Sequence, residues 1–292
     1  MSKRIVTHSG NFHTDDIFAV ATLLMVFPDA EVVRSREAEV WKTADILVDV
    51  GGVYDPRSFK FDHHQIEGAG ARKNSIPYAS FGLVWKEFGE KVTGSEEALD
   101  IIDEKLAMPI DAIDNGVALS TPKFPGVREY TLYDYLNSYI DHEETDPDVL
   151  MEAFMKLVGV ARDLLEREIN IAKNIAKDTQ EVTKIINETL DKRIIVLSTR
   201  AAWERVVAQF PEVVFVVYPR REGSWGVKGV AAGLGSFERK KFLPESWAGK
   251  QADELAFVTG VRDAIFCHRD RFLAGAKSKE GALKLAEIAL NS

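Results

Sequence analysis

The chain alternates between short apolar segments with the spacing of strands and longer segments with the spacing of helices. Extended segments are predicted at residues 3–8, 30–35, 44–52 and 58–62. Helical spacing is found at residues 15–27, 76–90, 95–107 and 130–140. Strands that alternate with helices usually form a parallel sheet that helices cover. The first half of the chain is therefore predicted to be an α/β domain with a parallel sheet.

A long amphipathic segment follows this first part. Residues 149–177 place apolar side chains at helical spacing, which predicts a helix roughly 40 Å long at 1.5 Å per residue. Further strands are expected at 193–198 and 213–219, with a glycine-rich stretch at 226–235. We therefore expect three parts: a first domain at 1–145, a linker helix at 146–190 and a second domain at 191–292.

The composition is that of an ordinary globular protein, with 46% hydrophobic and 28% charged residues. The single cysteine, Cys267, allows no internal disulfide and favours a reducing compartment, so we expect a cytoplasmic protein. We expect Cys267 to be buried rather than reactive. No apolar run reaches the roughly 18 residues that would suggest a membrane span.

The net charge of −9 is unevenly distributed. From residue 191 onward there are 17 Lys and Arg against 12 Asp and Glu, a balance of +5, which leaves −14 for the first 190 residues. An acidic first part argues against a broad DNA-coating surface and is compatible with a site that holds cations. The basic second part could bind an anionic substrate. The alternative is that these charges are simply solvated surface.

Imidazole and carboxylate groups follow three of the predicted strands. His8 ends the first strand, and Asp49 ends the third. The fourth extended segment ends in "FDHHQ", where the chain must leave the strand at Asp62 if His63 and His64 are to face one target. Ligands of open α/β sheets bind beyond the carboxyl ends of the strands. The pattern therefore predicts one site built from all three segments.

The residue types at these strand ends point to a divalent metal. "SGNFHTDD" adds His13, Asp15 and Asp16 to the set. Imidazoles with carboxylates suit Mn²⁺, Fe²⁺ or Zn²⁺ better than Ca²⁺, and five or six such groups suffice for two ions. Taken one at a time, these residues could be helix caps or turn residues. Their clustering in the first 64 residues favours the metal site.

Several segments resemble, in the same order, the MYG (melanocyte-proliferating-gene) branch of the DHH phosphoesterase superfamily. They are "HSGNFHTDD", "DILVDVGG", "VYDPRSFKFDHHQ", "IPYASFGLVW", "DAIDNG", "FERKKFLPESWAG" and "FCHRDRFLAG". The resemblance covers nearly the whole chain. It implies an N-terminal doubly wound, parallel-sheet DHH-type domain, a linker helix and a smaller C-terminal α/β substrate-binding domain. The activity it implies is a metal-dependent 3′–5′ exonuclease acting on RNA.

The resemblance also assigns roles to individual residues. Where the superfamily has His-x3-Asp-x-Asp, this chain has His8-x4-His13-x-Asp15, a departure that leaves one or two ions open. The fourth motif falls in "DAIDNG", where Asp114, before the Asn-Gly turn, is preferred to Asp111. The implied metal ligands are His8, His13, Asp15, Asp49, His63 and Asp114, and the implied catalytic residues are Asp62, His63 and His64. Mn²⁺ is the expected ion, with Mg²⁺ or Zn²⁺ as alternatives.

The substrate is expected to contact the second domain. "GVKGVAAGLG" resembles the glycine-rich substrate loop of DHH-associated domains, in which the backbone can approach a phosphate. The predicted substrate-binding residues are Lys228, Gly229, Arg239, Lys240 and His268. Without the resemblance, the glycine run could equally be a packed strand and turn.

Three functions remain open from the sequence. The first is a phosphodiesterase, most of all a 3′–5′ exonuclease on RNA or short oligonucleotides, that uses a metal-activated water. The second is a phosphatase or pyrophosphatase with the same metal centre. The third is a binding protein that has kept the fold without catalysis. The complete set of predicted ligands argues against the third.

Overall fold

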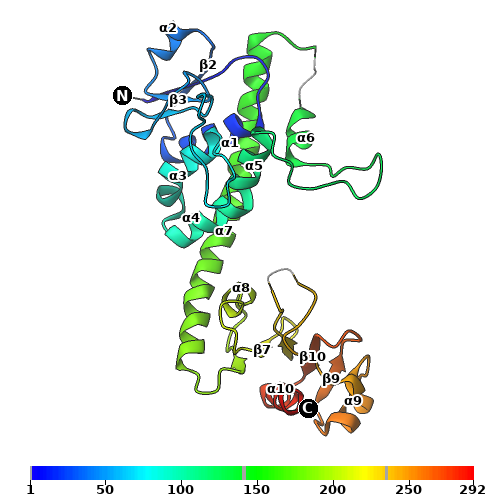
Figure 1. Ribbon diagram of the computed structural model, residues 1–292. Coiled ribbons are helices and arrows are strands. Elements are labelled where there is room, and N and C mark those ends of the chain that lie inside the picture. The colour runs from blue at the N-terminus through cyan, green and yellow to red at the C-terminus, as the bar shows by residue number, and fades with distance from the viewer. Residues whose placement is uncertain (1, 140–142, 234–235) are drawn as a thin grey trace. The chain divides into compact units, whose positions relative to one another are not determined.

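The computed structural model describes residues 2–139, 143–233 and 236–292. The chain divides into two compact units, Met1–Lys173 and Asn174–Ser292, and each is described by itself. Each unit contains helices and one sheet with parallel strands, so the α/β class is confirmed (Figure 1). The boundary falls inside the long helix α7 (Pro147–Glu188).

The first unit contains a five-stranded sheet of order β2-β1-β3-β5-β4. Its strands are β1 (Arg4–Thr7), β2 (Glu31–Arg34), β3 (Ile46–Val48), β4 (Tyr54–Asp55) and β5 (Lys60–Phe61). β2, β1, β3 and β5 are parallel, as predicted, while β4 pairs antiparallel with β5 at the edge. The carboxyl ends of β1, β3 and β5 therefore lie on the same edge of the sheet.

The third strand is shorter than the predicted 44–52. It ends at Val48 because the next residue, Asp49, has φ +55°, and Gly51 and Gly52 have φ +94° and +65°. Such left-handed conformations interrupt a strand, and aspartate is one of the few non-glycine residues that tolerates them. The chain therefore turns away from the strand direction at Asp49.

The helices of the first unit are α1 (Thr14–Val26), α2 (Ala38–Trp41), α3 (Ser80–Thr93), α4 (Glu96–Ile102), α5 (Met108–Asp114) and α6 (Leu132–Asn137). A π-helical turn, η2 (Asp103–Ala107), joins α4 to α5. Residues 14–23 of α1 are all buried, which makes α1 the central helix of the unit (Figure 1). The predicted helix at 130–140 is observed as α6, and residue 140 lies outside the described residues.

Helix α7 begins at Pro147 and continues to Glu188, eleven residues beyond the amphipathic pattern at 149–177 and within the range 146–190 predicted for the linker helix. Its buried side chains recur at helical spacing, from Leu150 and Phe154 to Val182 and Ile186. The pattern after residue 177 thus has the same apolar face as the pattern before it. The helix contributes residues to both units.

The second unit has a mixed sheet of order β6-β7-β8-β10-β9. The strands are β6 (Ile194–Val196), β7 (Phe215–Pro219), β8 (Trp225–Gly229), β9 (Ala264–Cys267) and β10 (Leu273–Ala276). Among the strands that the structure describes in this unit, β6 and β7 pair in parallel and the other pairs are antiparallel. Three helices, α8 (Glu204–Val207), α9 (Ala252–Thr259) and α10 (Lys279–Asn291), and the short turn η3 (Glu245–Trp247) complete the unit.

Across the ranges that the structure describes, no helix combines the length and the apolar character needed to cross a membrane.

Candidate metal centre

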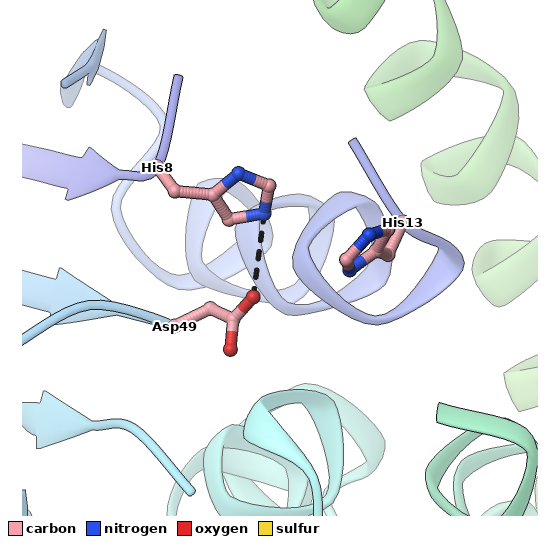
Figure 2. A group of neighbouring side chains, drawn as sticks. All are labelled: His8, His13 and Asp49. Atoms are coloured by element: carbon pink, nitrogen blue, oxygen red, sulfur yellow. Dashed lines mark ion pairs between the residues drawn. The ribbon is translucent and has the colours of Figure 1, made fainter. Parts of the chain in front are cut away.

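The carboxyl edge of the first sheet brings the predicted ligands together. His8 follows β1, Asp49 follows β3 and Asp62 follows β5 directly. His13 immediately precedes α1, whose first turn contains Asp15 (Figure 2). Strand order places the ends of β1, β3 and β5 side by side, so residues separated by more than 50 positions meet at one edge.

Three groups of side chains have ligand atoms within 4.8 Å of one another. They are His8, His13 and Asp49; Asp49, His63 and His64; and Asp15, His63 and Asp114. All six predicted ligands belong to these groups, and Asp49 and His63 are each shared by two of them. We call this set, together with His64, the carboxyl-edge cluster.

The closest contacts within the cluster join imidazole nitrogens to carboxylate oxygens. His8 Nε2 lies 3.3 Å from Asp49 Oδ2 (Figure 2). His63 Nε2 lies 3.4 Å from Asp49 Oδ1 and 3.1 Å from Asp114 Oδ2. His64 Nδ1 is 3.4 Å from the same Asp49 oxygen as His63. The two adjacent histidines therefore both reach Asp49, because the chain has left the strand at Asp62.

The geometry of these contacts fits a cation better than a set of hydrogen bonds. His8 Nε2 and His63 Nε2 are buried, yet neither has a partner in hydrogen-bonding geometry among the described residues. Buried polar atoms are almost always hydrogen-bonded, so such atoms call for an explanation. A divalent cation held by these two nitrogens would supply the missing partner.

The carboxylates of the cluster attract positive charge. Burial would lower the pKa of His8, but contacts with Asp16 and Asp49 outweigh it and raise that pKa to about 10. Burial likewise opposes protonation of His63, whose pKa Asp114 and Asp49 raise to about 11. Burial and the charges of neighbouring aspartates raise the pKa of Asp15 well above its ordinary value. A divalent cation would supply the positive charge that these carboxylates demand.

Asp15 is held by the N-terminus of α3. Its carboxylate accepts hydrogen bonds from Ser80 N (3.1 Å) and Phe81 N (2.6 Å), and it is fully buried. The N-cap of α3, Ala79, has no side-chain oxygen to cap the helix, so a carboxylate from α1 takes that role. The hydroxyl of Ser80 in turn donates to Asp49 Oδ1 at 3.1 Å. The start of α3 therefore orients two residues of the cluster.

The two aspartates of "DAIDNG" have different surroundings. Asp114, at the end of α5, contacts His63 and lies 3.8 Å from His13 Nδ1. Asp111 is fully buried outside the cluster, where it pairs with Arg72 Nη1 at 2.7 Å and accepts a hydrogen bond from Gly82 N at 2.9 Å. The structure therefore brings Asp114, and not Asp111, to the predicted ligands.

Asp62 lies beside the cluster and orients His64. Its Oδ1 is 2.8 Å from His64 Nδ1 and accepts the His64 backbone N–H at 3.1 Å, while its Oδ2 accepts Gly52 N at 2.5 Å. In this arrangement His64 carries a proton on Nδ1 and donates it in a hydrogen bond to Asp62. The His64 side chain is 62% exposed, so its Nε2 faces accessible space.

Two residues near His8 were not among the predicted ligands. Asp16 is fully buried, with Oδ2 3.1 Å from His8 Nε2, and its Oδ1 accepts the backbone N–H of His13 at 2.9 Å. Arg36 Nη2 lies 3.2 Å from His8 Nδ1. The doubled aspartate of "HTDD" places Asp16 among the candidate metal-site residues, but the family resemblance does not include it among the implied ligands. Nothing in the local pattern marks Arg36.

In the second unit, the predicted loop residues Lys228 and Gly229 lie in strand β8, which corrects the expectation of a phosphate-binding loop there. A Cβ at Gly229 would lie 2.7 Å from Lys241 O, and one at Gly226 would lie 3.0 Å from the Tyr218 ring. Glycine is required in this strand because neighbouring groups approach the backbone closely. The far end of the glycine-rich stretch, residues 234–235, lies outside the described residues.

The cationic side chains predicted for the substrate have partners within this unit. Lys228 Nζ is 3.1 Å from Glu204 Oε1. Lys240 Nζ donates to Phe210 O and Val213 O, at 2.8 and 3.0 Å, which fixes it against the protein. Arg239 lies over the Phe272 ring, 5.4 Å from its centroid, and the His268 ring is 4.4 Å from the same ring. Arg239 and His268 therefore share one aromatic neighbour.

Comparison with known proteins connects this geometry to a family. The family model described as "Uncharacterised protein family (UPF0160)", named for MYG1 exonucleases, matches residues 4–290. The chain belongs to this family. It is 29% identical to the "MYG1 exonuclease" of Homo sapiens over 98% of this chain and 85% of that protein.

Other family members are also similar to this chain over nearly its whole length. The "MYG1 protein YER156C" of Saccharomyces cerevisiae is 30% identical over 99% of this chain and 96% of that protein. The "MYG1 protein" of Dictyostelium discoideum is 26% identical over 98% and 96%. A solved structure of an uncharacterized Helicobacter pylori protein aligns at 10% identity with a TM-score of 0.21, too low to support an argument.

Proposed function

We propose that this protein is a metal-dependent phosphodiesterase, a 3′–5′ exonuclease that acts on RNA or short oligonucleotides. The observation that carries the proposal is the carboxyl-edge cluster, in which His8 Nε2 and His63 Nε2 are buried without hydrogen-bond partners among the described residues. The naming of similar proteins as exonucleases supports the same reaction class. We propose the DHH-type architecture for the first unit on the basis of its motifs.

Six residues would hold the cation or cations: His8, His13, Asp15, Asp49, His63 and Asp114. Mn²⁺ is our proposed ion, with Mg²⁺ and Zn²⁺ as alternatives, and when bound it would act as a Lewis acid and lower the pKa of a bound water to near neutrality. Ser80 and the N-terminus of α3 keep Asp15 and Asp49 in position through hydrogen bonds. Asp16, whose Oδ1 accepts the backbone N–H of His13, would hold the segment before α1 in position.

The exposed imidazole of His64 is the proposed proton-transfer group. Asp62 fixes its Nδ1 proton, so the Nε2 lone pair is available on the accessible side of the cluster. Hydrolysis adds water to phosphorus, breaks the bond to the leaving oxygen and delivers a proton to that oxygen. His64 can take a proton from water or return one to the leaving group, and Asp62 keeps its ring oriented throughout.

We propose that residues of the second unit bind the nucleic-acid backbone. Arg239 and His268, with Phe272 between them, offer positive charge and an aromatic face. Lys228 would add positive charge, whereas Gly229 contributes close packing and Lys240 holds the unit's own backbone. Replacing Arg239 by Ala should raise KM for oligonucleotides and reduce the salt dependence of binding by roughly one unit or less, with metal content unchanged.

The test of the reaction class is a hydrolysis screen with Mn²⁺ across labelled RNA, DNA, dinucleotides and pyrophosphate. We expect RNA or short oligonucleotides to be shortened from the 3′ end, and chelation to abolish the reaction. His63→Ala should abolish both hydrolysis and Mn²⁺ binding. Rapid cleavage of pyrophosphate, with RNA and DNA of every length intact, would replace this proposal with a small-phosphate hydrolase.

The control separates chemistry from folding. Asp29→Asn changes a carboxylate outside the carboxyl-edge cluster and should retain wild-type turnover. His63→Ala should unfold cooperatively in the absence of metal, as the wild type does. Full hydrolysis by His63→Ala in chelator would show that the cluster is not the reacting site.

A further inference from the structure

A cavity of about 390 Å³ opens beside the carboxyl-edge cluster. One wall consists of His13, Asp15 and Asp114. The opposite walls are apolar or aromatic and come from two helices: Ile110 and Ile113 on α5, and Leu132 and Tyr133 on α6. A volume of this size is in the range of small-ligand sites. The cavity lies entirely within the first unit.

The cavity contains one polar atom with no assigned role. Thr14, the first residue of α1, lines the cavity and is 8% exposed. Its Oγ1 has no hydrogen-bond partner among the described residues. A buried hydroxyl in that state costs free energy unless a ligand or water satisfies it. The cavity wall therefore combines apolar residues with Thr14 and with the polar groups of His13, Asp15 and Asp114.

Tyr133 supplies a stacking surface. Tyr133 is 45% exposed although it lines the cavity, so part of its surface remains free to contact a ligand. Ile113, also half-exposed at 44%, contributes an apolar surface. A flat ring with a polar edge suits an aromatic and apolar wall: it would contact Tyr133 and Ile113, and its edge would bond to Thr14.

We propose that this cavity receives the nucleobase of the substrate's terminal nucleotide, the nucleotide whose phosphate reacts at the carboxyl-edge cluster. The proposal rests on the proposed function and adds the residues that recognise the base. The wall formed by Asp114 and Asp15 places the phosphate-processing groups directly next to the cavity. Recognition depends on stacking and on one hydrogen bond, so the cavity should accept more than one kind of base.

Equilibrium binding tests the proposal without catalysis. Calorimetry in Mn²⁺ buffer should show that adenosine 5′-monophosphate binds the wild-type protein roughly 5- to 150-fold tighter than ribose 5-phosphate, the range expected for stacking of one base. Tyr133→Ala should reduce this ratio to near one. Thr14→Val should weaken adenosine 5′-monophosphate about 2- to 13-fold, as for one neutral hydrogen bond, and leave ribose 5-phosphate unchanged.

Two further variants keep the test decisive. Tyr130→Ala removes a 72% exposed tyrosine that does not line the cavity, and it should retain the full ratio. Ile113→Trp should fill the cavity and abolish the ratio even if Tyr133→Ala proves unstable. Equal binding of the two ligands by the wild type, or a ratio that Tyr133→Ala and Ile113→Trp both retain, would overturn the proposal.

The outcome is separable from that of the proposed function. If the wild type shortens RNA but does not distinguish the two ligands, the nucleobase site is wrong and the exonuclease stands. If the ratio depends on Tyr133 as expected but no phosphodiester is hydrolysed, the site is supported as a nucleotide-binding pocket and the exonuclease fails.

Discussion

Gly82→Ala should destabilise the first unit and disturb the carboxyl-edge cluster, although glycine to alanine in a helix interior usually stabilises. An added Cβ would lie 1.8 Å from Asp111 Oδ2, 2.7 Å from Asp111 Cγ and 2.8 Å from Arg72 Nη2. Distances of this size are far below van der Waals contact. Asp111 has no room to move, because it is fully buried and held by both Arg72 and the Gly82 N–H.

The magnitude follows from two opposing effects. Alanine in place of a helical glycine contributes about 0.5–1 kcal/mol of stability. Overpacking a buried site costs about 1–3 kcal/mol, and displacing Asp111 from Arg72 adds to that cost. We expect a net loss of about 2 kcal/mol, which corresponds to a fall in Tm of about 4–8 °C for a unit of this size. Since Gly82 follows Ser80 and Phe81, activity should fall as well.

Calorimetric or urea unfolding monitored by circular dichroism measures this loss. Gly159→Ala is the matched control: it also lies in a helix, α7, but no described atom lies within 4 Å of its added Cβ. It should therefore gain up to about 1 kcal/mol. A Gly82→Ala protein as stable as Gly159→Ala would refute the inference that Asp111 is fixed against the start of α3.

The remaining predictions concern the cluster, the cysteine and the metal. Asp114→Asn should abolish Mn²⁺ binding and hydrolysis, whereas Asp111→Asn should retain most of both; the opposite ranking, measured by metal titration and turnover, would make Asp111 the ligand. Burial raises the pKa of Cys267 from 9.0 to about 11, so its thiol should resist a thiol reagent at pH 9 until the protein unfolds. Because the pKa is higher in the folded than in the unfolded protein, the contribution of Cys267 to stability is complete below pH 9 and is lost as pH rises toward 11. Rapid labelling of the native protein at pH 9 would contradict this. Adding Mn²⁺ at 100 times its Kd should stabilise the protein by about 2.7 kcal/mol, and a Tm unchanged by chelation would mean that the cluster binds no metal.

The position of the candidate site could be predicted from local pattern. Short apolar runs interleaved with helical segments indicate parallel strands, and the residue that follows each strand is known as soon as the strand is placed. The pattern therefore predicts His8, Asp49 and Asp62 at one edge of the sheet, where the structure has them. The "FDHHQ" segment also indicated its own strand end, because adjacent side chains of a strand cannot share a target.

Tertiary structure decided how the cluster is completed and supported. Asp111 and Asp114 are three residues apart on α5. The Asn-Gly turn favours Asp114 as the ligand, but the packing of α5 decides that Asp114 faces His63 and Asp111 faces Arg72. The roles of Asp16 and Ser80 likewise depend on how α1 and α3 pack, since each acts on a residue that is distant in the sequence or lies on another element.

In the second unit, too, tertiary structure decided the conformation of a segment that the sequence left open. "GVKGV" has a composition that a loop and a strand share, and only the family resemblance favours a loop. In the structure residues 226–229 lie in β8, where Lys241 O and the Tyr218 ring approach the backbone too closely for a side chain at Gly229 and Gly226. Local sequence determined where strands end and which chemical groups follow them. Packing between distant elements determined which of those groups meet, because contact depends on strand order and helix placement rather than on neighbouring residues.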